Sequence, residues 1–328
     1  MAVYDPDPVY GERLAEYVSH RGQVPFSVTA FTSLERLKAY ARDHEIELLL
    51  IHSSVPAEEA EKIGAARMIR LAGEEEEYEE GGPVQIYKYQ AADSMMREVM
   101  ACYCSAEGEP VFAGVSGTAW IIGIYSPVNR CLKTSLALTM GQLMARDLKV
   151  LYLNLEDCSG LKRLTGEEYR GGLSELLYYY SQNEFNWGRL GSLVYTWGDL
   201  DYVPPVRYPE DLFQVTAQSM ADLVERISRE STYETVILDL GQFGAKALEV
   251  LEICDVVYMP VKEDCVSAAK IEEFEEYLAS SGHEPLKNRI QKLKLPYHCS
   301  PGRKGNYLEQ LLWGELGDYT RQLLRKQP

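Results

Sequence analysis

Long apolar runs are absent from this chain, and basic residues are few. No window of the 328 residues approaches the roughly 18 uninterrupted apolar residues of a membrane span, and the first residues form neither a basic nor an apolar leader region. We therefore expect a cytoplasmic protein without an integral membrane segment. Lysine and arginine number 33 against 50 aspartates and glutamates, which gives a net charge of −17. This imbalance argues against binding to nucleic acid or anionic lipid, because both favour a basic surface.

Paired cysteine motifs are also missing. The seven cysteines include no C-x-x-C pair, and the single C-x-C, formed by Cys102 and Cys104, has no further ligands at regular spacing. A structural zinc site or a disulfide framework needs such a set. We therefore expect reduced thiols that hold no metal.

The most informative absence is that of glycine just before Lys133 and Thr134, in a segment with the outline of a strand, a loop and a helix. In a phosphate-binding loop, G-x-x-x-x-G-K-[ST], glycines let backbone N–H groups converge on the anion, lysine reaches the phosphates and the hydroxyl binds Mg²⁺. Here the glycine positions fall on Pro127 and Leu132, which adopt positive φ poorly. The alternative is an ordinary helix start, with Thr134 or Ser135 near the N-cap.

Two apolar runs further along the chain end in acidic residues. Residues 149–156 and 235–241 each fit a buried strand, as does the run 120–125 before the loop. Parallel strands bring their carboxyl ends to one edge of the sheet, where α/β proteins bind ligands. We therefore expect Glu156 and Asp239 at the same edge as the loop lysine.

The loop and the acid-tipped strands together resemble the MinD/ParA class of deviant-Walker P-loop ATPases, and the resemblance covers residues 119–328. The family loop K-G-G-x-G-K-[TS]-T aligns with residues 128–135, where Lys133 and Thr134 match and Val128 replaces the signature lysine. The resemblance implies an α/β fold with a mostly parallel sheet flanked by helices, and ATP and Mg²⁺ as ligands. The chain is most similar to the CpaE-type pilus-assembly branch, which carries a receiver-like domain in front.

The resemblance also implies roles for individual residues. The switch I acid of the family falls on Glu156, which would orient the attacking water, and the switch II aspartate and glycine fall on Asp239 and Gly241. These two acids are the implied catalytic residues, and Thr134 and Asp239 would hold Mg²⁺ together with the nucleotide. The implied nucleotide-binding residues are Asn129, Arg130, Cys131, Leu132, Lys133, Thr134, Ser135 and Gly241.

Departures from the family loop lower the expected rate of catalysis. The signature lysine of the family crosses a dimer interface to the partner's phosphates, which Val128 cannot do. Arg130 is a candidate replacement, because a guanidinium donates well to phosphate. Asn129 tolerates left-handed backbone and is expected to replace one lost glycine, whereas Leu132 is not suited to this role. Removing one such cationic donor costs about three decades in rate, so fast hydrolysis is not expected.

The N-terminal third alternates short strands and helices. Candidate strands are 2–7, 26–30, 46–51 and 84–90, and candidate helices are 10–20 and 34–42. This order resembles the flavodoxin-like fold of a response-regulator receiver. His52 stands where a receiver has its phosphoacceptor aspartate, so aspartyl phosphorylation is not expected. Asp5 and Asp7 resemble the receiver's acidic pair, and Lys88 matches its fifth-strand lysine. The alternative for His52 is a packed or solvent-facing histidine without chemistry.

Composition and length indicate two domains. With 46% apolar and 25% charged residues the chain is globular, and its length is large for one ordinary domain. Glycine and small polar residues predict a linker at 105–118. The predicted organisation is a receiver-like domain over 1–104 and a P-loop ATPase domain with a degenerate Walker A loop over 119–328. Six glutamates in the seven residues 74–80 predict a solvated loop, with an acidic docking tag as the alternative.

The C-terminal residues 307–324 carry apolar side chains at helical spacing. MinD ends in a membrane-seeking helix, but here glycines interrupt the stripe and its polar face is not basic. We expect this stripe to dock onto this or another subunit, and we expect no peripheral membrane contact.

The resemblance implies a nucleotide-switch protein that binds ATP weakly or hydrolyses it slowly. It would act in spatial positioning or in pilus or secretion assembly, as a homodimer or with protein partners. The alternative is a catalytically inactive pseudo-ATPase scaffold that works through protein–protein interaction. A DNA-binding response regulator would need a basic helix-turn-helix module, which the sequence does not show.

Overall fold

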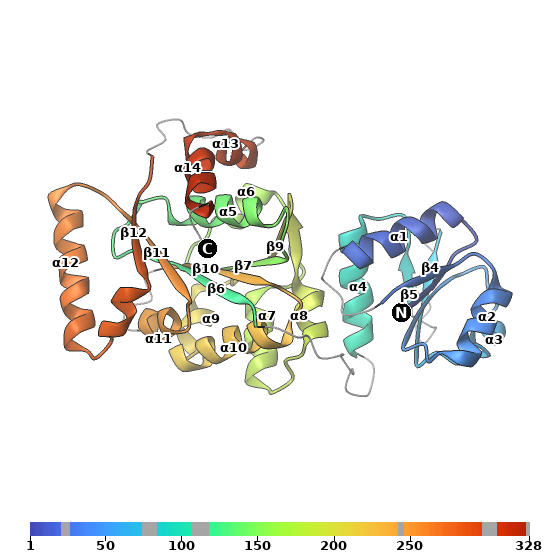
Figure 1. Ribbon diagram of the computed structural model, residues 1–328. Coiled ribbons are helices and arrows are strands. Elements are labelled where there is room, and N and C mark those ends of the chain that lie inside the picture. The colour runs from blue at the N-terminus through green and yellow to red at the C-terminus, as the bar shows by residue number, and fades with distance from the viewer. Residues whose placement is uncertain (21–26, 74–83, 106–117, 242–245, 297–306, 326–328) are drawn as a thin grey trace. The chain divides into compact units, whose positions relative to one another are not determined.

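The computed structural model describes residues 1–20, 27–73, 84–105, 118–241, 246–296 and 307–325. The chain divides into two compact units (Figure 1). Unit 1 comprises Met1–Gly114 with Phe185–Ser192, and unit 2 comprises Val115–Glu184 with Leu193–Pro328. The acidic run at 74–80 and most of the expected linker at 105–118 lie outside the described residues.

Unit 1 contains a five-stranded sheet in which every neighbouring pair is parallel, in the order β2-β1-β3-β4-β5. The strands are β1 (Ala2–Tyr4), β2 (Thr29–Phe31), β3 (Leu48–His52), β4 (Arg67–Ala72) and β5 (Gln85–Tyr87). The helices between and after them are α1 (Pro8–His20), α2 (Leu34–Asp43), α3 (Ala57–Glu61) and α4 (Ala92–Ser105). This strand order is that of flavodoxin-like doubly wound sheets.

Helices cover both faces of the unit 1 sheet. On one face, Val18 of α1 and Val99 of α4 belong to a buried cluster with side chains of β1, β3, β4 and β5. On the other face, Leu37 of α2 and Ala60 of α3 pack with alternate residues of β1 and β3. The continuous apolar sequence of β3 follows from this, because a parallel strand between two helical layers is buried on both sides.

Unit 2 is built on a seven-stranded sheet in the order β12-β11-β6-β10-β7-β9-β8. The strands are β6 (Trp120–Ile124), β7 (Val150–Leu155), β8 (Tyr195–Trp197), β9 (Leu200–Val203), β10 (Thr235–Leu240), β11 (Val256–Val261) and β12 (Ile290–Lys294). Neighbours are parallel except for the edge pair β8 and β9, which is antiparallel. The predicted α/β fold with a mostly parallel sheet flanked by helices is confirmed.

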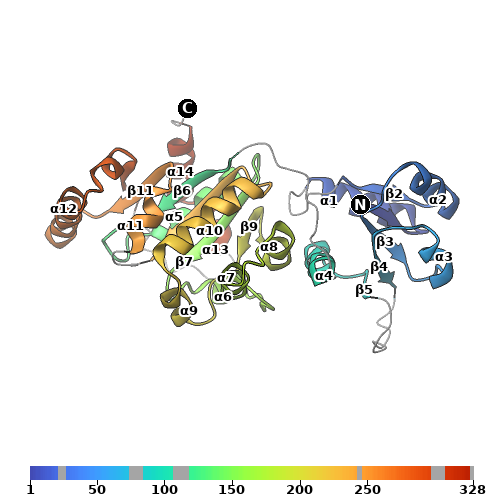
Figure 2. The same ribbon diagram turned by 90° about the horizontal axis from the view of Figure 1, so that it is seen from below.

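Helices flank this sheet on both faces. The helices from residue 133 onward are α5 (Lys133–Met144), α6 (Leu161–Thr165), α7 (Leu173–Ser181), α8 (Trp187–Leu193, most of which groups with unit 1), α9 (Pro209–Gln214), α10 (Ala217–Glu230), α11 (Lys246–Glu252), α12 (Cys265–Ser280), a 3₁₀ helix (Glu284–Asn288), α13 (Tyr307–Trp313) and α14 (Glu315–Leu324). α5 and the C-terminal pair cover one face of the sheet, while α10 and α11 cover the other (Figures 1 and 2). Side-chain caps begin three of them: Asn186 caps α8, Thr216 caps α10, and Asp264 caps α12.

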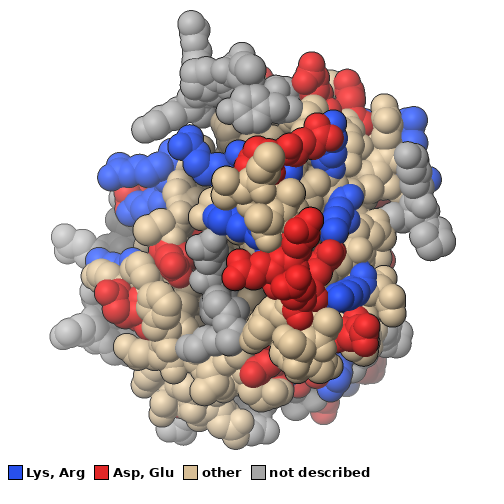
Figure 3. Space-filling view, turned by 90° about the vertical axis from the view of Figure 1, so that its left-hand side faces the viewer, with Lys and Arg blue, Asp and Glu red and all other residues tan. Residues whose placement is uncertain are grey.

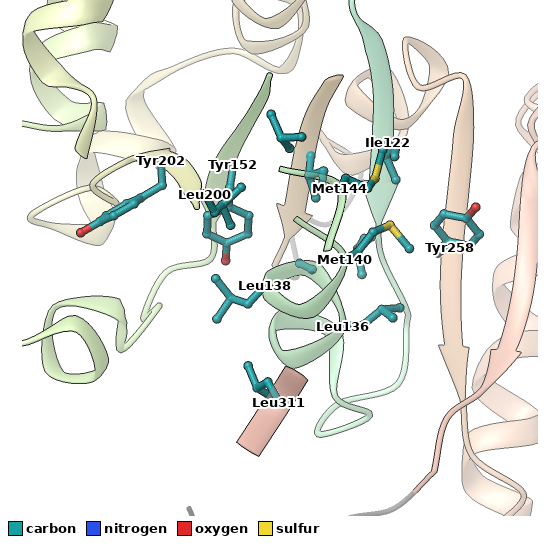
Figure 4. Close-up of a cluster of buried hydrophobic side chains, with 14 of the residues drawn as sticks. Ile122, Leu136, Leu138, Met140, Met144, Tyr152, Leu200, Tyr202, Tyr258 and Leu311 are labelled. Atoms are coloured by element: carbon teal, nitrogen blue, oxygen red, sulfur yellow. The ribbon is translucent and has the colours of Figure 1, made fainter. Parts of the chain in front are cut away.

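α5 is the central helix of the unit 2 core. Leu136 and Met140 of α5 are fully buried in a cluster that also contains Ile122 of β6 (Figure 4). Leu311 of α13 and Leu316 of α14 belong to the same cluster, so α5 is enclosed between the sheet and the C-terminal helices. The first turn of α5, which carries the loop lysine, is therefore held by packing on two sides.

The C-terminal apolar stripe packs on its own chain, which is one of the two docking arrangements expected from the sequence. Leu311 and Leu316 are buried, and Gly314 separates the two helices that carry them. Trp313 is the exception, because 73% of it is exposed, and the guanidinium of Arg321 lies 5.5 Å from its ring centre. Within the described residues, no helix combines the length and the apolar composition that crossing a membrane requires.

The side of unit 2 on which α12 lies carries mixed charge. Figure 3 shows acidic side chains gathered near the centre of this face, with basic side chains around them. β12 forms two ion pairs at 2.6 Å: Lys292 with Glu275 of α12, and Lys294 with Glu263, which lies just before α12. The described part of this face is therefore not the broad basic surface that binds nucleic acid.

Candidate functional site

The loop between β6 and α5 has left-handed backbone without glycine. Arg130 has φ 54° and Leu132 has φ 67°, and both stand at glycine positions of the family loop. Asn129, which the sequence favoured for this conformation, does not adopt it. A left-handed conformation costs a non-glycine residue about 1–2 kcal/mol, so two such residues in one short loop are strained. Local strain of this kind is typical of functional loops.

The start of α5 does not match the alternative of an ordinary capped helix. The helix begins at Lys133, and its N-cap residue is Leu132, which offers no side-chain hydrogen bond. Thr134 and Ser135 therefore lie inside the first turn, and the N–H groups of that turn have no hydroxyl or carboxylate cap. An uncapped helix N-terminus leaves N–H donors that suit an anion.

Val128 is turned into the protein. It forms a small buried cluster with Cys131 and with Ile271 of α12. Its N–H donates to Ser126 Oγ at 3.1 Å, and the Cys131 thiol donates to the Val128 carbonyl at 3.1 Å. Burial raises the pKa of Cys131, so this thiol is a packing residue and not a reactive thiolate. Val128, which stands where the family has its signature lysine, is thus part of the hydrophobic core.

Lys133, Thr134 and Glu156 meet at the carboxyl edge of the sheet. Lys133 is buried, and its Nζ donates to the carbonyl of Leu240 at 3.1 Å. The same Nζ lies 3.7 Å from Glu156 Oε1, and Thr134 Oγ1 donates to Glu156 Oε2 at 3.3 Å. One carboxylate therefore contacts both groups that the sequence assigned to phosphate and Mg²⁺.

Asp239 is fully buried at the end of β10, with one oxygen bonded and one not. Its Oδ2 accepts from the Tyr152 hydroxyl at 2.9 Å and from Asn154 Nδ2 at 3.0 Å. Within the described residues no hydrogen-bond donor meets Oδ1 in suitable geometry, although the Thr134 hydroxyl lies near enough to affect the pKa of Asp239. An unsatisfied buried carboxylate oxygen is costly, and it marks a place where a cation or a water would be stabilised.

The pKa of Asp239 is raised from 3.8 to about 7. Burial is the largest cause and the charge of Glu156 is the second, while Thr134, Tyr152 and Lys133 oppose the increase. Two carboxylates that share one small site thus make the deprotonated form of Asp239 unfavourable. A divalent cation at this place would reverse that effect.

Gly241 permits a close approach of two strand ends. A Cβ added at this position would lie 3.0 Å from the Cα of Glu156 and 3.1 Å from the carbonyl oxygen of Leu155. Any larger residue would therefore push the end of β7 away from the end of β10. This glycine keeps the two acidic strand ends within reach of Lys133.

The other predicted residues lie outside this cluster. Asn129 and Arg130 are exposed on the loop, and the Ser135 hydroxyl is 3.0 Å from the Tyr307 hydroxyl of α13. Sequence reasoning missed Tyr152, whose hydroxyl also accepts from Asn154 Nδ2 at 2.8 Å. Because alternate residues of a strand face the same side, the spacing of Tyr152 and Asn154 was the available signal.

The cluster suits Mg²⁺ that is bound together with a phosphate. Within the described residues no group of three or more His, Cys, Asp and Glu side chains could hold a metal alone. Mg²⁺ commonly takes one or two protein oxygens and completes its shell with water and phosphate oxygens. The Thr134 hydroxyl and the unsatisfied oxygen of Asp239 provide such a pair.

Unit 1 has its own polar cluster at the carboxyl edge of its sheet. Asp5 follows β1 and Lys88 follows β5, and they form a buried salt bridge of 2.9 Å. His52 ends β3, and its Nδ1 is 2.8 Å from the Ser54 hydroxyl. Burial lowers the pKa of His52, and Lys88 lowers it further, so the imidazole is neutral at physiological pH.

Asp7 does not take part in this cluster. It is exposed, and its Oδ1 accepts from the N–H of Val9 at 2.9 Å in the first turn of α1. Asp5 also accepts from the N–H of Asp7 at 2.9 Å through Oδ1. Of the two acids that the sequence grouped together, only Asp5 therefore faces Lys88.

No family model matches the chain, and no curated protein matches it. Among solved structures, the chain is similar to a ParA family ATPase from Chlorobium tepidum TLS, with 18% identity over 63% of this chain and 94% of that one and a TM-score of 0.44. It is also similar to the septum site-determining protein MinD from Pyrococcus horikoshii OT3, complexed with Mg-ADP, with 13% identity, coverage of 58% and 77%, and a TM-score of 0.43.

A third similar structure is cobyrinic acid a,c-diamide synthase from Mycobacterium smegmatis, with a bound ATP analog and magnesium. It has 13% identity over 59% of this chain and 81% of that one, and a TM-score of 0.43. The strand order, the parallel pairing and the acidic carboxyl edge define the class: an α/β protein with a lysine-bearing loop at the edge of a mostly parallel sheet.

Proposed function

We propose that unit 2 is a MinD/ParA-like nucleotide switch that binds ATP with Mg²⁺ at the carboxyl edge of its sheet. The observation that supports this most strongly is the meeting of four side chains, from three separate segments, at one place: Lys133, Thr134, Glu156 and Asp239. Chance packing rarely gathers a buried lysine and two carboxylates, one of them unsatisfied, beside an uncapped helix N-terminus.

Each residue has a distinct role in this proposal. The N–H groups of the loop and of the first turn of α5 donate hydrogen bonds to phosphate oxygens. The Lys133 ammonium group compensates part of the negative charge of the phosphates. Thr134 and Asp239 hold Mg²⁺, which supplies charge stabilisation at the phosphate oxygens. Glu156 orients the attacking water, and Gly241 keeps its backbone within reach.

Glu156 must release its contacts before phosphate binds. Its carboxylate now contacts both Lys133 and Thr134, as a phosphate would. Nucleotide binding would therefore displace the Glu156 side chain and move the end of β7, which is the kind of two-state change that a switch needs. The competition between carboxylate and phosphate also lowers the apparent affinity for ATP.

Hydrolysis is slow in this proposal. Val128 is buried where the family has its lysine, so it supplies no charge to a second subunit. Arg130 is exposed on the same loop and is the remaining candidate for that charge. The rate is expected to be about three decades below that of an enzyme with the full set of cationic donors.

Unit 1 acts in this proposal as a pseudo-receiver of the CpaE-like branch. Lys88 is fully engaged with Asp5, and His52 cannot form an aspartyl phosphate. The protein would then work in the cytoplasm, in spatial positioning or in pilus or secretion assembly, as a homodimer or with protein partners. Unit 1 would then signal by binding a protein partner and not by phosphoryl transfer.

Titration of the purified chain with a fluorescent ATP analogue and Mg²⁺ tests the proposal. We expect saturable binding that is lost in Lys133→Ala and kept in Arg229→Ala, an exposed control on α10. No binding at millimolar ligand in the parent protein would end the proposal.

A pseudo-ATPase scaffold is the second candidate, and one observation favours it. Glu156 already satisfies Lys133 and Thr134, and the loop side chains Arg130 and Leu132 replace glycines that would admit phosphate. A scaffold would show the same melting temperature with and without MgATP, in the parent protein and in Lys133→Ala alike.

A further inference from the structure

A second polar cleft lies in unit 2, beyond β7 and away from the phosphate loop. Its walls are the segment 159–175, which contains α6 and the start of α7, and the segment 204–207, which follows β9. Both segments leave the carboxyl edge of the sheet, at strands next to each other in the order β10-β7-β9. None of the four side chains of the phosphate site lines it. The cleft is therefore a separate site.

The floor of the cleft is a close backbone contact. A Cβ at Gly172 would lie 2.6 Å from the carbonyl oxygen of Pro204, which is closer than real atoms come. The next N–H, that of Leu173, donates to the same carbonyl at 2.8 Å. This bond joins the two walls of the cleft through the backbone.

The charge of the cleft is opposite to that of the whole chain. Its lining includes four cationic side chains, Lys162, Arg163, Arg170 and Arg207, and two acidic ones, Glu168 and Glu175. Both acids are engaged: Glu168 pairs with Lys162 at 2.7 Å, and Glu175 accepts from the N–H of Gly172 at 2.7 Å. A chain of net charge −17 thus concentrates positive charge in one hollow.

Exposed aromatic side chains lie on α7, on α9 and at residue 208, which are continuous in the chain with the two walls of the cleft. Tyr208 is 56% exposed beside the Arg207 guanidinium, which lies 5.5 Å from its ring centre. Tyr178 of α7 is 60% exposed, and Phe213 of α9 is 63% exposed. The two helices are joined, because Ser174 Oγ donates to Asp211 at 2.5 Å. Arginine and aromatic side chains are the residues that most often anchor a protein partner.

We propose that this cleft binds an acidic peptide segment of a protein partner. The guanidinium groups of Arg163 and Arg207 match carboxylates as paired donors, whereas Lys162 is a point charge that already pairs with Glu168. The Pro204-Pro205-Val206 wall and Tyr169, which also lines the cleft, suit an apolar or aromatic residue between the acidic ones. A folded and highly acidic protein is repelled from acidic partners elsewhere on its surface, so charge directs such a segment to this cleft.

Fluorescence anisotropy with a labelled, glutamate-rich peptide containing one tyrosine tests this, using the full chain without nucleotide. We expect saturable binding that weakens with salt, and at least a tenfold loss in Arg163→Gln/Arg207→Gln. The control Arg226→Gln/Arg229→Gln makes the same charge change on α10, outside the cleft, and should alter binding less than twofold. Arg163→Lys/Arg207→Lys keeps the charge and should retain part of the affinity, even if the glutamine pair proves unstable.

Equal losses in the two glutamine pairs would overturn the proposal, because binding would then follow net charge alone. Equal competition by a glutamine-for-glutamate peptide would also overturn it, as would stronger binding of inorganic phosphate or of a short single-stranded oligonucleotide at the same residues. Lys133→Ala should bind the peptide as the parent does. Failure at the phosphate site and failure at the cleft are therefore distinguishable.

Discussion

The two sheets of this protein each place a lysine and an acid at their carboxyl edge, but they satisfy them differently. In unit 1, Lys88 and Asp5 form a buried pair at 2.9 Å, and the neighbouring histidine is held neutral. In unit 2, Lys133 is 3.7 Å from Glu156, and Asp239 keeps one buried oxygen without an assigned donor. The charged groups at the edge of the unit 1 sheet are therefore paired with each other, whereas Asp239 at the edge of the unit 2 sheet keeps an unsatisfied oxygen.

This difference indicates where a ligand is needed. A closed ion pair gains nothing from a phosphate or a cation, because both charges are already compensated. Two acids close together, one with a pKa raised to about 7, gain from a divalent cation. The contrast therefore supports the proposal that unit 2, and not the polar cluster of unit 1, responds to a small ligand.

We expect the largest effect from breaking the buried Asp5–Lys88 ion pair at the edge of the unit 1 sheet. Lys88→Met should lower the free energy of unfolding of unit 1 by about 3–5 kcal/mol, because it leaves Asp5 charged, buried and unpaired. Lys38→Met breaks a partly exposed pair with Glu59 and should cost less than about 1 kcal/mol. Urea denaturation measures both. Equal effects would show that the Asp5–Lys88 pair is not buried as described.

The pH dependence of the free energy of unfolding tests the raised pKa of Asp239 at the edge of the unit 2 sheet. Since the folded pKa of Asp239 lies above 3.8, the folded state keeps a proton that the unfolded state loses as the pH rises from about 4 to about 7. The contribution of Asp239 to the free energy of unfolding therefore falls across this window, by roughly a few kcal/mol. Asp239→Asn should be more stable than the parent at pH 8 and similar to it at pH 4, in denaturation followed at both pH values. A constant difference would contradict the raised pKa.

Removing the competing carboxylate should strengthen nucleotide binding. Glu156→Gln frees Lys133 and Thr134 from a charged partner and removes the second cause of the raised Asp239 pKa. We expect about tenfold tighter binding of the fluorescent ATP analogue with Mg²⁺, which is about 1.4 kcal/mol. Asp157→Asn, an exposed acid on the same segment, is the matched control. Unchanged affinity in Glu156→Gln would mean that this carboxylate does not occupy the phosphate position.

The smallest effect comes from the strained loop. Arg130→Gly should raise the free energy of unfolding by about 0.5 kcal/mol, because relief of the left-handed strain slightly exceeds the entropy that glycine loses on folding. Asn129→Gly, at the neighbouring exposed position without positive φ, should lower it by about 0.5–1 kcal/mol. Thermal denaturation of the two variants compares these signs directly. Destabilisation in both would indicate that Arg130 is not strained.

Much of the architecture follows from the sequence, because short continuous apolar runs that end in polar residues favour buried parallel strands. The runs before Lys133, Glu156 and Asp239 became β6, β7 and β10, and edge placement then brought the three side chains together. Leu311 and Leu316 of the C-terminal stripe pack in the core of their own chain, which is one of the two docking arrangements that the sequence left open.

Other features depend on contacts that no local pattern encodes. The left-handed residues of the loop are Arg130 and Leu132 and not Asn129, so the expectations for Asn129 and Leu132 were both wrong. The same loop buries Val128 and Cys131 against Ile271 of α12, a contact that the local sequence does not reveal. The sequence grouped Asp7 with Asp5, but Asp7 caps α1 instead. The approach of Gly172 to Pro204 links segments far apart in the chain, and only the folded structure shows it.

The most direct measurement is the melting temperature of the full chain with and without MgATP, in the parent protein and in Lys133→Ala. A ligand that binds only the folded state raises its stability by about 2.7 kcal/mol at a concentration one hundred times its dissociation constant. We predict a clear upward shift in the parent, none in Lys133→Ala, and a normal shift in Arg229→Ala. Identical melting curves with and without MgATP in the parent would contradict a nucleotide-binding role for unit 2.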